Sequence, residues 1–258
     1  MSKSSLIFIL LCIWPFIAML NAQDTKAALM PARPGMSPFP SKLDKGLLAL
    51  ETGVSAFRSE KENIKDLTTQ IPLQIRFGLL ENLELNLTMA YEFFRVDGNR
   101  SDDDYTGLGE TSIGAKIKIA DEKGIFPRIE FHGSLELPYF GESLSIPDDV
   151  EPDFDINFLH NINNQTQLTY GAGIFWRGPD ENGFYGMKFT RFMKERHAFF
   201  AEHYGLLRGN NKNEFHLGFG YLFWIKEKIQ FDIGFDFGGL KETRIWGLNT
   251  GLSFLLKD

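Results

Sequence analysis

The stretch Ile229 to Phe237, IQFDIGFDF, decides the fold class of this chain. Side chains alternate between the two faces of an extended strand, so a period of two separates this stretch into two sides. A soluble sheet turns the apolar side of such a strand toward its core, whereas a membrane β-barrel turns it toward lipid. One side carries Ile229, Phe231, Ile233, Phe235 and Phe237, and the other carries Gln230, Asp232, Gly234 and Asp236.

The beginning of the chain has the pattern of a secretory signal. Lys3 is the only charge in the first 23 residues, and an apolar run follows from Leu6 to Leu20. This run of about 15 residues is shorter than the roughly 20 that a membrane-spanning helix needs. The small residue Ala22 suits the position before a cleavage point. We expect residues 1–22 to be a cleaved signal peptide; the alternative is an uncleaved anchor.

Removing this leader changes what the remaining chain can do. The single cysteine, Cys12, leaves with it, so the mature chain has no disulfide, no cysteine metal site and no thiol nucleophile. Lys3 also leaves, which moves the formal charge from -7 to about -8. An acidic chain lacks the basic footprint of nucleic-acid binding, so we expect no nucleic-acid partner. Residues 23–45 hold four of the eleven prolines, and we expect an irregular segment there on the periplasmic side.

The rest of the chain, residues 46–258, repeats the alternating pattern in twelve segments. Single-chain bacterial barrels have an even number of strands, and a tilted membrane strand takes about 9–11 residues. Short and longer polar connections alternate between the segments, as periplasmic turns and external loops do. We therefore predict an all-β, antiparallel up-and-down transmembrane β-barrel of about 12 strands. The segments are 46–57, 67–79, 82–94, 107–119, 125–137, 153–162, 165–177, 183–193, 197–207, 214–225, 229–237 and 243–256.

The distribution of charge favours a lipid-facing apolar side. Charged residues gather on one face of nearly every segment, and the opposite face carries almost none. A soluble twelve-stranded barrel with phenylalanines inside would enclose a lumen too wide for them to fill, because the diameter grows with strand number. We therefore expect a cell outer membrane location, with outer-membrane lipid and lipopolysaccharide against the apolar face.

Several short motifs resemble a known family. Arg33-Pro34-Gly35 is similar to its N-terminal element, Gly107-Leu108-Gly109-Glu110 and Gly114-Ala115-Lys116 to its central signature, and Leu135-Glu136-Leu137-Pro138 to the end of its fifth strand. This is the outer-membrane barrel family labelled as transporters of the MetA-pathway of phenol degradation. The resemblance implies transport of small solutes, aromatic or other hydrophobic compounds among them. Asn249 to Leu256 also resembles the C-terminal signal read by the barrel-assembly machinery.

The polar face predicts which residues line the lumen. Charges there can form a selective pore lining, or they can tie neighbouring strands together as ion pairs. Pairs of Arg76 with Glu84, and of Glu130 with Lys116 or Lys118, are expected from the strand order. The predicted inward acids are Glu51, Glu84, Glu92, Glu110, Glu130, Glu136, Asp155, Glu202, Asp232 and Asp236. The predicted inward bases are Arg76, Lys116, Lys118, Arg128, Arg177 and Lys188, together with His132.

The predicted function is passive passage of small solutes through an outer-membrane channel. Inward glycines leave room for inward Phe126, Phe175 and Trp224, which either form a partly apolar path or simply pack. A lipid-modifying enzyme is one alternative, and His132 beside Ser134 on one strand is its strongest candidate. A structural or adhesive barrel is another. We predict no catalytic residue, no cofactor and no metal site.

Overall fold

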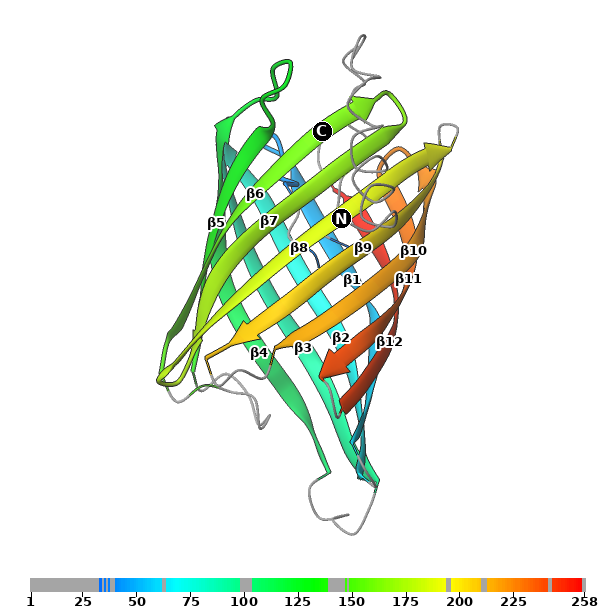
Figure 1. Cartoon of the computed structure of the whole chain (residues 1–258). Helices are drawn as coiled ribbons and strands as arrows, with labels where there is room; N and C mark the ends of the chain where they lie inside the picture. Colours follow the sequence, from blue (N-terminus) through cyan, green and yellow to red (C-terminus); the bar gives the residue numbers. More distant parts are fainter. Residues whose placement is uncertain are drawn as a thin grey trace, which may run out of the picture.

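The structure, a computed structural model, shows a closed barrel of twelve strands (Figure 1). It describes residues 33, 35, 37, 40–61, 64–97, 104–138, 147, 149–193, 196–209, 213–240 and 243–256. The predicted signal peptide, residues 1–22, lies outside them. The strands are β1 (Leu48–Lys61), β2 (Ile64–Leu80), β3 (Leu83–Asp97), β4 (Tyr105–Ala120), β5 (Arg128–Glu136), β6 (Glu151–Asn163), β7 (Thr166–Arg177), β8 (Asp180–Met193), β9 (His197–Arg208), β10 (Glu214–Lys226), β11 (Ile229–Leu240) and β12 (Thr243–Leu255).

Every strand pairs antiparallel with its neighbours in sequence, and β12 closes on β1. The closing ladder runs without a register shift from Ala49 opposite Leu255 to Lys61 opposite Thr243. Closure leaves no strand edge unpaired, which a sheet inside lipid requires. The predicted twelve-stranded up-and-down barrel is confirmed. None of the described residues forms a helix long and apolar enough to cross a membrane.

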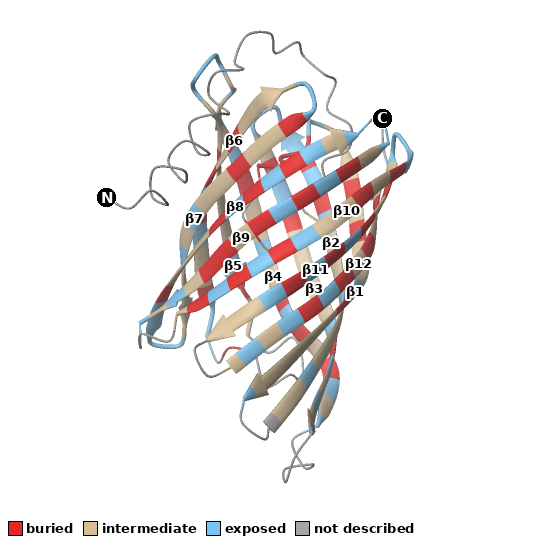
Figure 2. Cartoon of the chain, turned by 45° about the vertical axis from the view of Figure 1, so that its right-hand side comes forward, coloured by how far each residue is buried: buried red, intermediate tan, exposed pale blue. Residues whose placement is uncertain are grey.

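The two faces of the wall differ as the sequence pattern predicts. Along β11 the inward residues Gln230, Asp232 and Asp236 are buried, whereas Phe235 and Phe237 are each 46% exposed on the outside. Figure 2 shows the same alternation of buried and exposed residues along the neighbouring strands. A polar inside and an apolar outside is the reverse of a soluble barrel. The opening stretch therefore turns its aromatic side outward.

The strands differ in length, so one side of the barrel is taller. Strand β2 has 17 residues and β4 has 16, but β5 has only 9. In Figure 1 the ends of β2, β3 and β4 on the side of the β3–β4 connection extend beyond the neighbouring ends of β5 to β9. The lumen is consequently bounded by a slanted rim.

Two predicted connections were wrong. Residues 58–66 were expected to form a polar loop, but Ser59 pairs with Asp66 and Glu60 with Lys65, so β1 and β2 continue almost to their hairpin. Residues 178–182 shorten to a two-residue turn, where Gly178 has a φ of 58°. Tight hairpins need such positive φ values, and glycine adopts them without strain. A strand can continue through polar residues where it extends beyond the lipid. Polar sequence therefore did not mark the true ends of these strands.

The irregular segment before β1 lies inside the barrel. Its described residues Ser37, Pro40, Ser41, Lys42 and Leu43 are all buried. The segment was expected on the periplasmic side, and this part of it lies within the lumen, beside the residues that flank the short β2–β3 turn. A chain without secondary structure has unpaired backbone N–H groups, and the acids of the inner wall provide acceptors for them. We call the described residues from Arg33 to Leu43 the plug.

Candidate functional site in the barrel lumen

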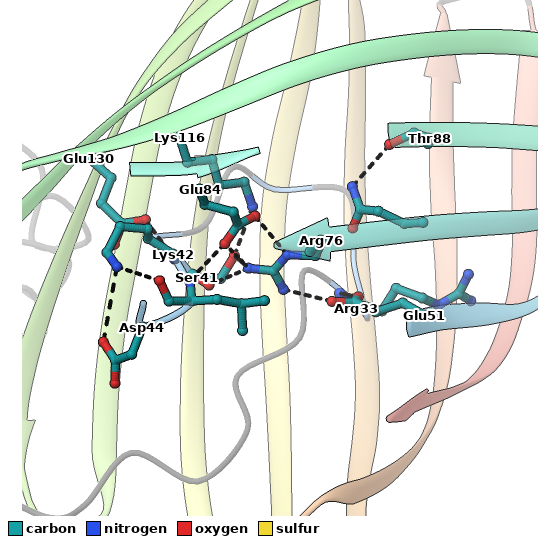
Figure 3. Close-up of polar contacts among 12 residues, drawn as sticks. Arg33, Ser41, Lys42, Asp44, Glu51, Arg76, Glu84, Thr88, Lys116 and Glu130 are labelled. Carbon is teal, nitrogen blue, oxygen red and sulfur yellow. Dashed lines mark hydrogen bonds and ion pairs between the residues drawn. The ribbon is translucent and has the colours of Figure 1, made fainter. Parts of the chain in front are cut away.

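Arg76 on β2 is the centre of the plug's main anchor, and its side chain is fully buried. Its Nη1 donates to Glu51 Oε1 at 2.6 Å, and its Nε and Nη2 donate to the two oxygens of Glu84 at 2.8 Å each. The expected pair of Arg76 with Glu84 is present, and Glu51 on β1 completes it. Nη2 also donates to the backbone oxygen of Ser41 in the plug (Figure 3). Because Glu84 is on β3, one guanidinium joins three neighbouring strands, β1, β2 and β3, to the plug.

Glu130 on β5 has partners that the sequence did not predict. Lys118 lies directly opposite Glu130 in the β4–β5 ladder, as the strand order predicted, but its ammonium pairs with Asp121. Arg128 forms the ion pair with Glu130, and the plug supplies a further donor. The backbone N–H of Lys42 donates to Glu130 Oε2 at 3.0 Å. The carboxylate therefore holds the plug against β5.

The two lysines of β4 are engaged elsewhere. Lys116 Nζ donates to Ser41 Oγ at 2.9 Å, so this lysine also contacts the plug. Lys118, nearer the turn, pairs with Asp121 at 2.8 Å. The hydrogen bond from Lys118 holds the pKa of the Asp121 carboxyl below its ordinary value. Only Lys116 of this pair contributes to the plug site.

Burial in the lumen disfavours the charged form of Lys42 in the plug. The Lys42 side chain is enclosed in the lumen, and this desolvation lowers the pKa of its ammonium group. Asp44 at 4.0 Å and Glu130 favour the charged form and partly offset the effect. Leu43 adds a backbone N–H donated to Glu84 Oε2 at 2.6 Å.

The other end of the plug reaches the opposite wall. The Ser37 N–H donates to Glu202 Oε2 on β9 at 3.1 Å, and the Arg33 N–H donates to Glu51 Oε2 at 3.2 Å. The Arg33 guanidinium donates to the backbone oxygen of Thr250 on β12 at 3.2 Å and lies 3.8 Å from Asp232 on β11. The plug therefore crosses the lumen from β5 to the seam between β11, β12 and β1.

A second group of acids lies toward the longer connections, away from the plug. We call Glu92, Glu110, Glu136, Glu151 and Asp153 the acidic vestibule. Arg177 pairs with Glu136 at 2.9 Å and with Glu151 at 3.4 Å, and Glu92 accepts from Gln70 and Tyr105. Glu110 stands at a register shift between β3 and β4 and is exposed to solvent. Carboxylates outnumber the cations that face them, so this half of the lumen is electronegative.

A buried aromatic network on β9 to β11 was missed by the sequence reasoning. Tyr204 stacks on His216 at 4.7 Å and donates to Asp236 Oδ2 at 2.6 Å. His216 contacts Asp236 and Glu214 through its two ring nitrogens, at 3.3 and 3.6 Å. The expected inward position of Asp236 is observed. The sequence of β9, HAFFAEHYGLLR, alternates less regularly than that of β11, so it gives little indication that Tyr204 faces inward.

Two further predicted lining residues have specific partners. Lys188 lies opposite Glu202 in the ladder of β8 and β9, and its ammonium stands 5.5 Å from the centre of the Phe200 ring.

Of the three predicted inward aromatics, Trp224 is buried. Phe126 is exposed in the β4–β5 connection, so the expectation that it faces inward was wrong.

The enzyme alternative rests on His132, whose contacts are structural. His132 Nδ1 lies 2.8 Å from Asp155 Oδ2 on the neighbouring strand. Among the residues that the structure describes, no hydrogen bond joins His132 to Ser134, and no three metal-binding side chains converge on one point. The geometry thus places His132 in a cross-strand pair.

The comparisons with known proteins bear on the fold. No family model matches the sequence, and no curated protein sequence matches it. The structure is similar to the COG4313 outer membrane channel from Pseudomonas putida F1, with 11% identity, 88% of this chain and 100% of that chain covered, and a TM-score of 0.64.

Two further structures share the architecture. The β domain of the Bordetella autotransporter Brka is 11% identical, with 82% and 99% of the two chains covered and a TM-score of 0.56. The CymD monoaromatic hydrocarbon channel is 9% identical, with 84% and 89% covered and a TM-score of 0.51. One architecture serves channels and autotransporters alike, so likeness of this kind identifies a fold and not an activity. The chain has the fold of the bacterial outer-membrane β-barrels.

Proposed function

We propose that this protein is an outer-membrane channel for the passive passage of small solutes, and that the plug narrows its lumen. The observation that carries the proposal is the division of the wall, with large apolar side chains outside and buried ionic groups inside. Such a wall is stable in lipid while its interior suits water and polar solutes. The outward face would contact membrane lipid and lipopolysaccharide, and Asn249 to Leu256 would be read by the barrel-assembly machinery.

The finer proposal concerns the solutes. The MetA-pathway resemblance of the N-terminal half, and the likeness to a channel described as one for monoaromatic hydrocarbons, support aromatic or other hydrophobic compounds as cargo. The charged lumen residues would then act in two ways, because those near the plug hold it and those of the acidic vestibule face the entering solute.

Reconstitution into planar bilayers tests the proposal. Folded protein, recognised by heat-modifiable migration in gels, should carry single-channel current and release small solutes from vesicles. A matched preparation of heat-unfolded protein controls for lipid leakage. Folded protein that passes neither ions nor solutes, with the plug present or deleted, would refute the channel function.

A further inference from the structure

Three polar side chains on the inner wall have no hydrogen-bond partner. Gln230 and Asp232 on β11 and Ser253 on β12 are each 0% exposed, and none of their side-chain oxygen or nitrogen atoms is hydrogen-bonded. Buried polar groups are nearly always paired, so three unpaired neighbours at one place need an explanation. We call these three residues the polar seam.

The ladder brings the three residues together. Gln230 lies directly opposite Ser253, and Asp232 follows Gln230 on the same face. On the other side of β11, Trp224 of β10 lies opposite Gln230. The seam therefore combines an amide, a hydroxyl and a carboxylate, with an indole ring at its edge.

Arg33 of the plug covers the Asp232 end of the seam without donating a hydrogen bond to the carboxylate. Its Nε is 3.8 Å from Asp232 Oδ1, and this nitrogen also lacks a hydrogen bond. The guanidinium packs against Gly251, the residue opposite Asp232, where an added Cβ would stand 2.7 Å from Nε. A donor this far from its carboxylate gains charge attraction but no hydrogen bond. Arg33 therefore lies over Asp232 and leaves the hydrogen-bonding capacity of this carboxylate unused.

The unused capacity defines the chemistry of a ligand. Asp232 offers acceptors, whereas Gln230 and Ser253 each offer a donor and an acceptor. A hydroxyl group both donates and accepts, so it can serve all three. Residues two apart on a strand are separated by about 6.5 Å, so a solute with several hydroxyl groups reaches both Gln230 and Asp232. The ring of Trp224 packs against Phe192 and the Ala198–Leu222 cluster, so it closes one end of the seam.

We propose that the polar seam is a recognition site of the channel for small neutral solutes that carry several hydroxyl groups, and that it is uncovered when Arg33 withdraws. This inference rests on the proposed channel function but not on the hydrophobic cargo proposed there, because it adds polyhydroxylated compounds as a second class of solute. It assigns a role to Gln230 and Ser253, which the ion pairs of the plug do not use, and a second role to Asp232, which pairs with Arg33.

Cysteine labelling tests the cover. The mature chain has no cysteine, so Ser253→Cys introduces a single thiol of nearly the same size as the hydroxyl it replaces. A small neutral methanethiosulfonate should modify this thiol slowly, and at least tenfold faster when Arg33→Ala is added. Glu81→Cys, in an exposed turn, should react at the same rate with and without Arg33→Ala. Equal modification rates for the Ser253→Cys thiol with Arg33 and with Arg33→Ala would overturn the proposal that Arg33 covers the seam. Gln230→Cys replaces Ser253→Cys if the latter does not fold.

Vesicle swelling tests the recognition. The swelling rate with arabinose, relative to that with betaine, should fall at least threefold in Gln230→Met and in Ser253→Ala, because betaine has no hydroxyl group. An unchanged ratio in both variants, with ionic conductance retained, overturns the recognition site and leaves the channel function standing. Loss of all conductance in the unmodified protein would instead overturn the channel function and this inference with it.

Discussion

At the scale of the residue, Arg76 shows why the lumen can hold so much charge. Its guanidinium is fully buried, yet every carboxylate around it receives a direct hydrogen bond. Removing ions from water is costly, and good geometry repays the cost only while all partners are present. The cluster is therefore sensitive to loss of one member.

We expect Arg76→Met to destabilise the folded barrel by about 3–5 kcal/mol, because it leaves Glu51 and Glu84 as buried carboxylates without their cation. Denaturant unfolding in lipid vesicles measures the loss. Arg177→Met is the matched control, since Arg177 also pairs with two acids but its side chain is 37% exposed. Its loss should stay below about 1 kcal/mol. Equal losses in the two variants contradict this account.

At the scale of the element, the β8–β9 hairpin depends on a close approach of side chains on its outer face. The Tyr185 ring lies over Gly205, where an added Cβ would stand 2.6 Å from a ring carbon. The hydroxyl of the same tyrosine is 3.1 Å from His203 Nε2, which gives this outward histidine a partner at the lipid face. Glycine at this position is what allows the ring to lie flat on the strand.

Gly205→Ala should therefore destabilise the barrel by about 1–3 kcal/mol, because the Tyr185 ring must move and loses its contact with His203. Gly183→Ala, on the neighbouring strand, is the control, since the nearest atom to its added Cβ is 3.6 Å away. That change should stay within about 0.5 kcal/mol. Thermal or denaturant unfolding of the two variants side by side measures both losses of stability. Equal losses would refute the role of the close approach between Tyr185 and Gly205.

The same scale shows what the sequence could predict. The strict alternation in stretches such as Ile229 to Phe237 predicted the strands and their lipid-facing side, because membrane and water impose one pattern on every strand. Arg76 and Glu84 could be paired because they flank one short turn. The contacts of Glu130 with Lys42 and of Lys116 with Ser41 could not, because Ser41 and Lys42 belong to a segment with no periodicity. Proline-rich sequence indicates irregular chain, but it does not indicate on which side of the wall that chain lies.

At the scale of the whole molecule, the barrel and the plug are separate in their bonding. The twelve strands form a continuous ring of ladders, and the plug adds only contacts from inside. We expect deletion of residues 23–43 to leave a folded barrel with a larger single-channel conductance, because the lumen is then free of the crossing chain. Bilayer recordings with a folding check by gel migration measure this. A folded deletion variant with unchanged conductance would show that the plug does not limit the path.

Charge is also divided across the whole molecule. The acidic vestibule has five carboxylates, and Arg177 is the cation paired with two of them. Lumen charges of one sign concentrate counter-ions, so the channel should prefer cations. The double variant Glu110→Gln with Asp153→Asn should shift the reversal potential in a salt gradient toward zero. Asp121→Asn, in the turn at the other end of the barrel, should shift it less, and the opposite order would contradict the vestibule's role.

The plug is covalently continuous with β1, and this makes it a tethered ligand of its own barrel. Gly46, with a φ of 82°, and the hydrogen bonds between Gly78 and the residues around it fix the base of the tether. From Arg33 to Leu43 the chain spans eleven residues, which reach at most roughly 38 Å when extended. A released plug therefore stays at an effective concentration on the order of millimolar. Its reclosure is independent of protein concentration, and a free peptide of the same sequence would compete with it only at millimolar levels.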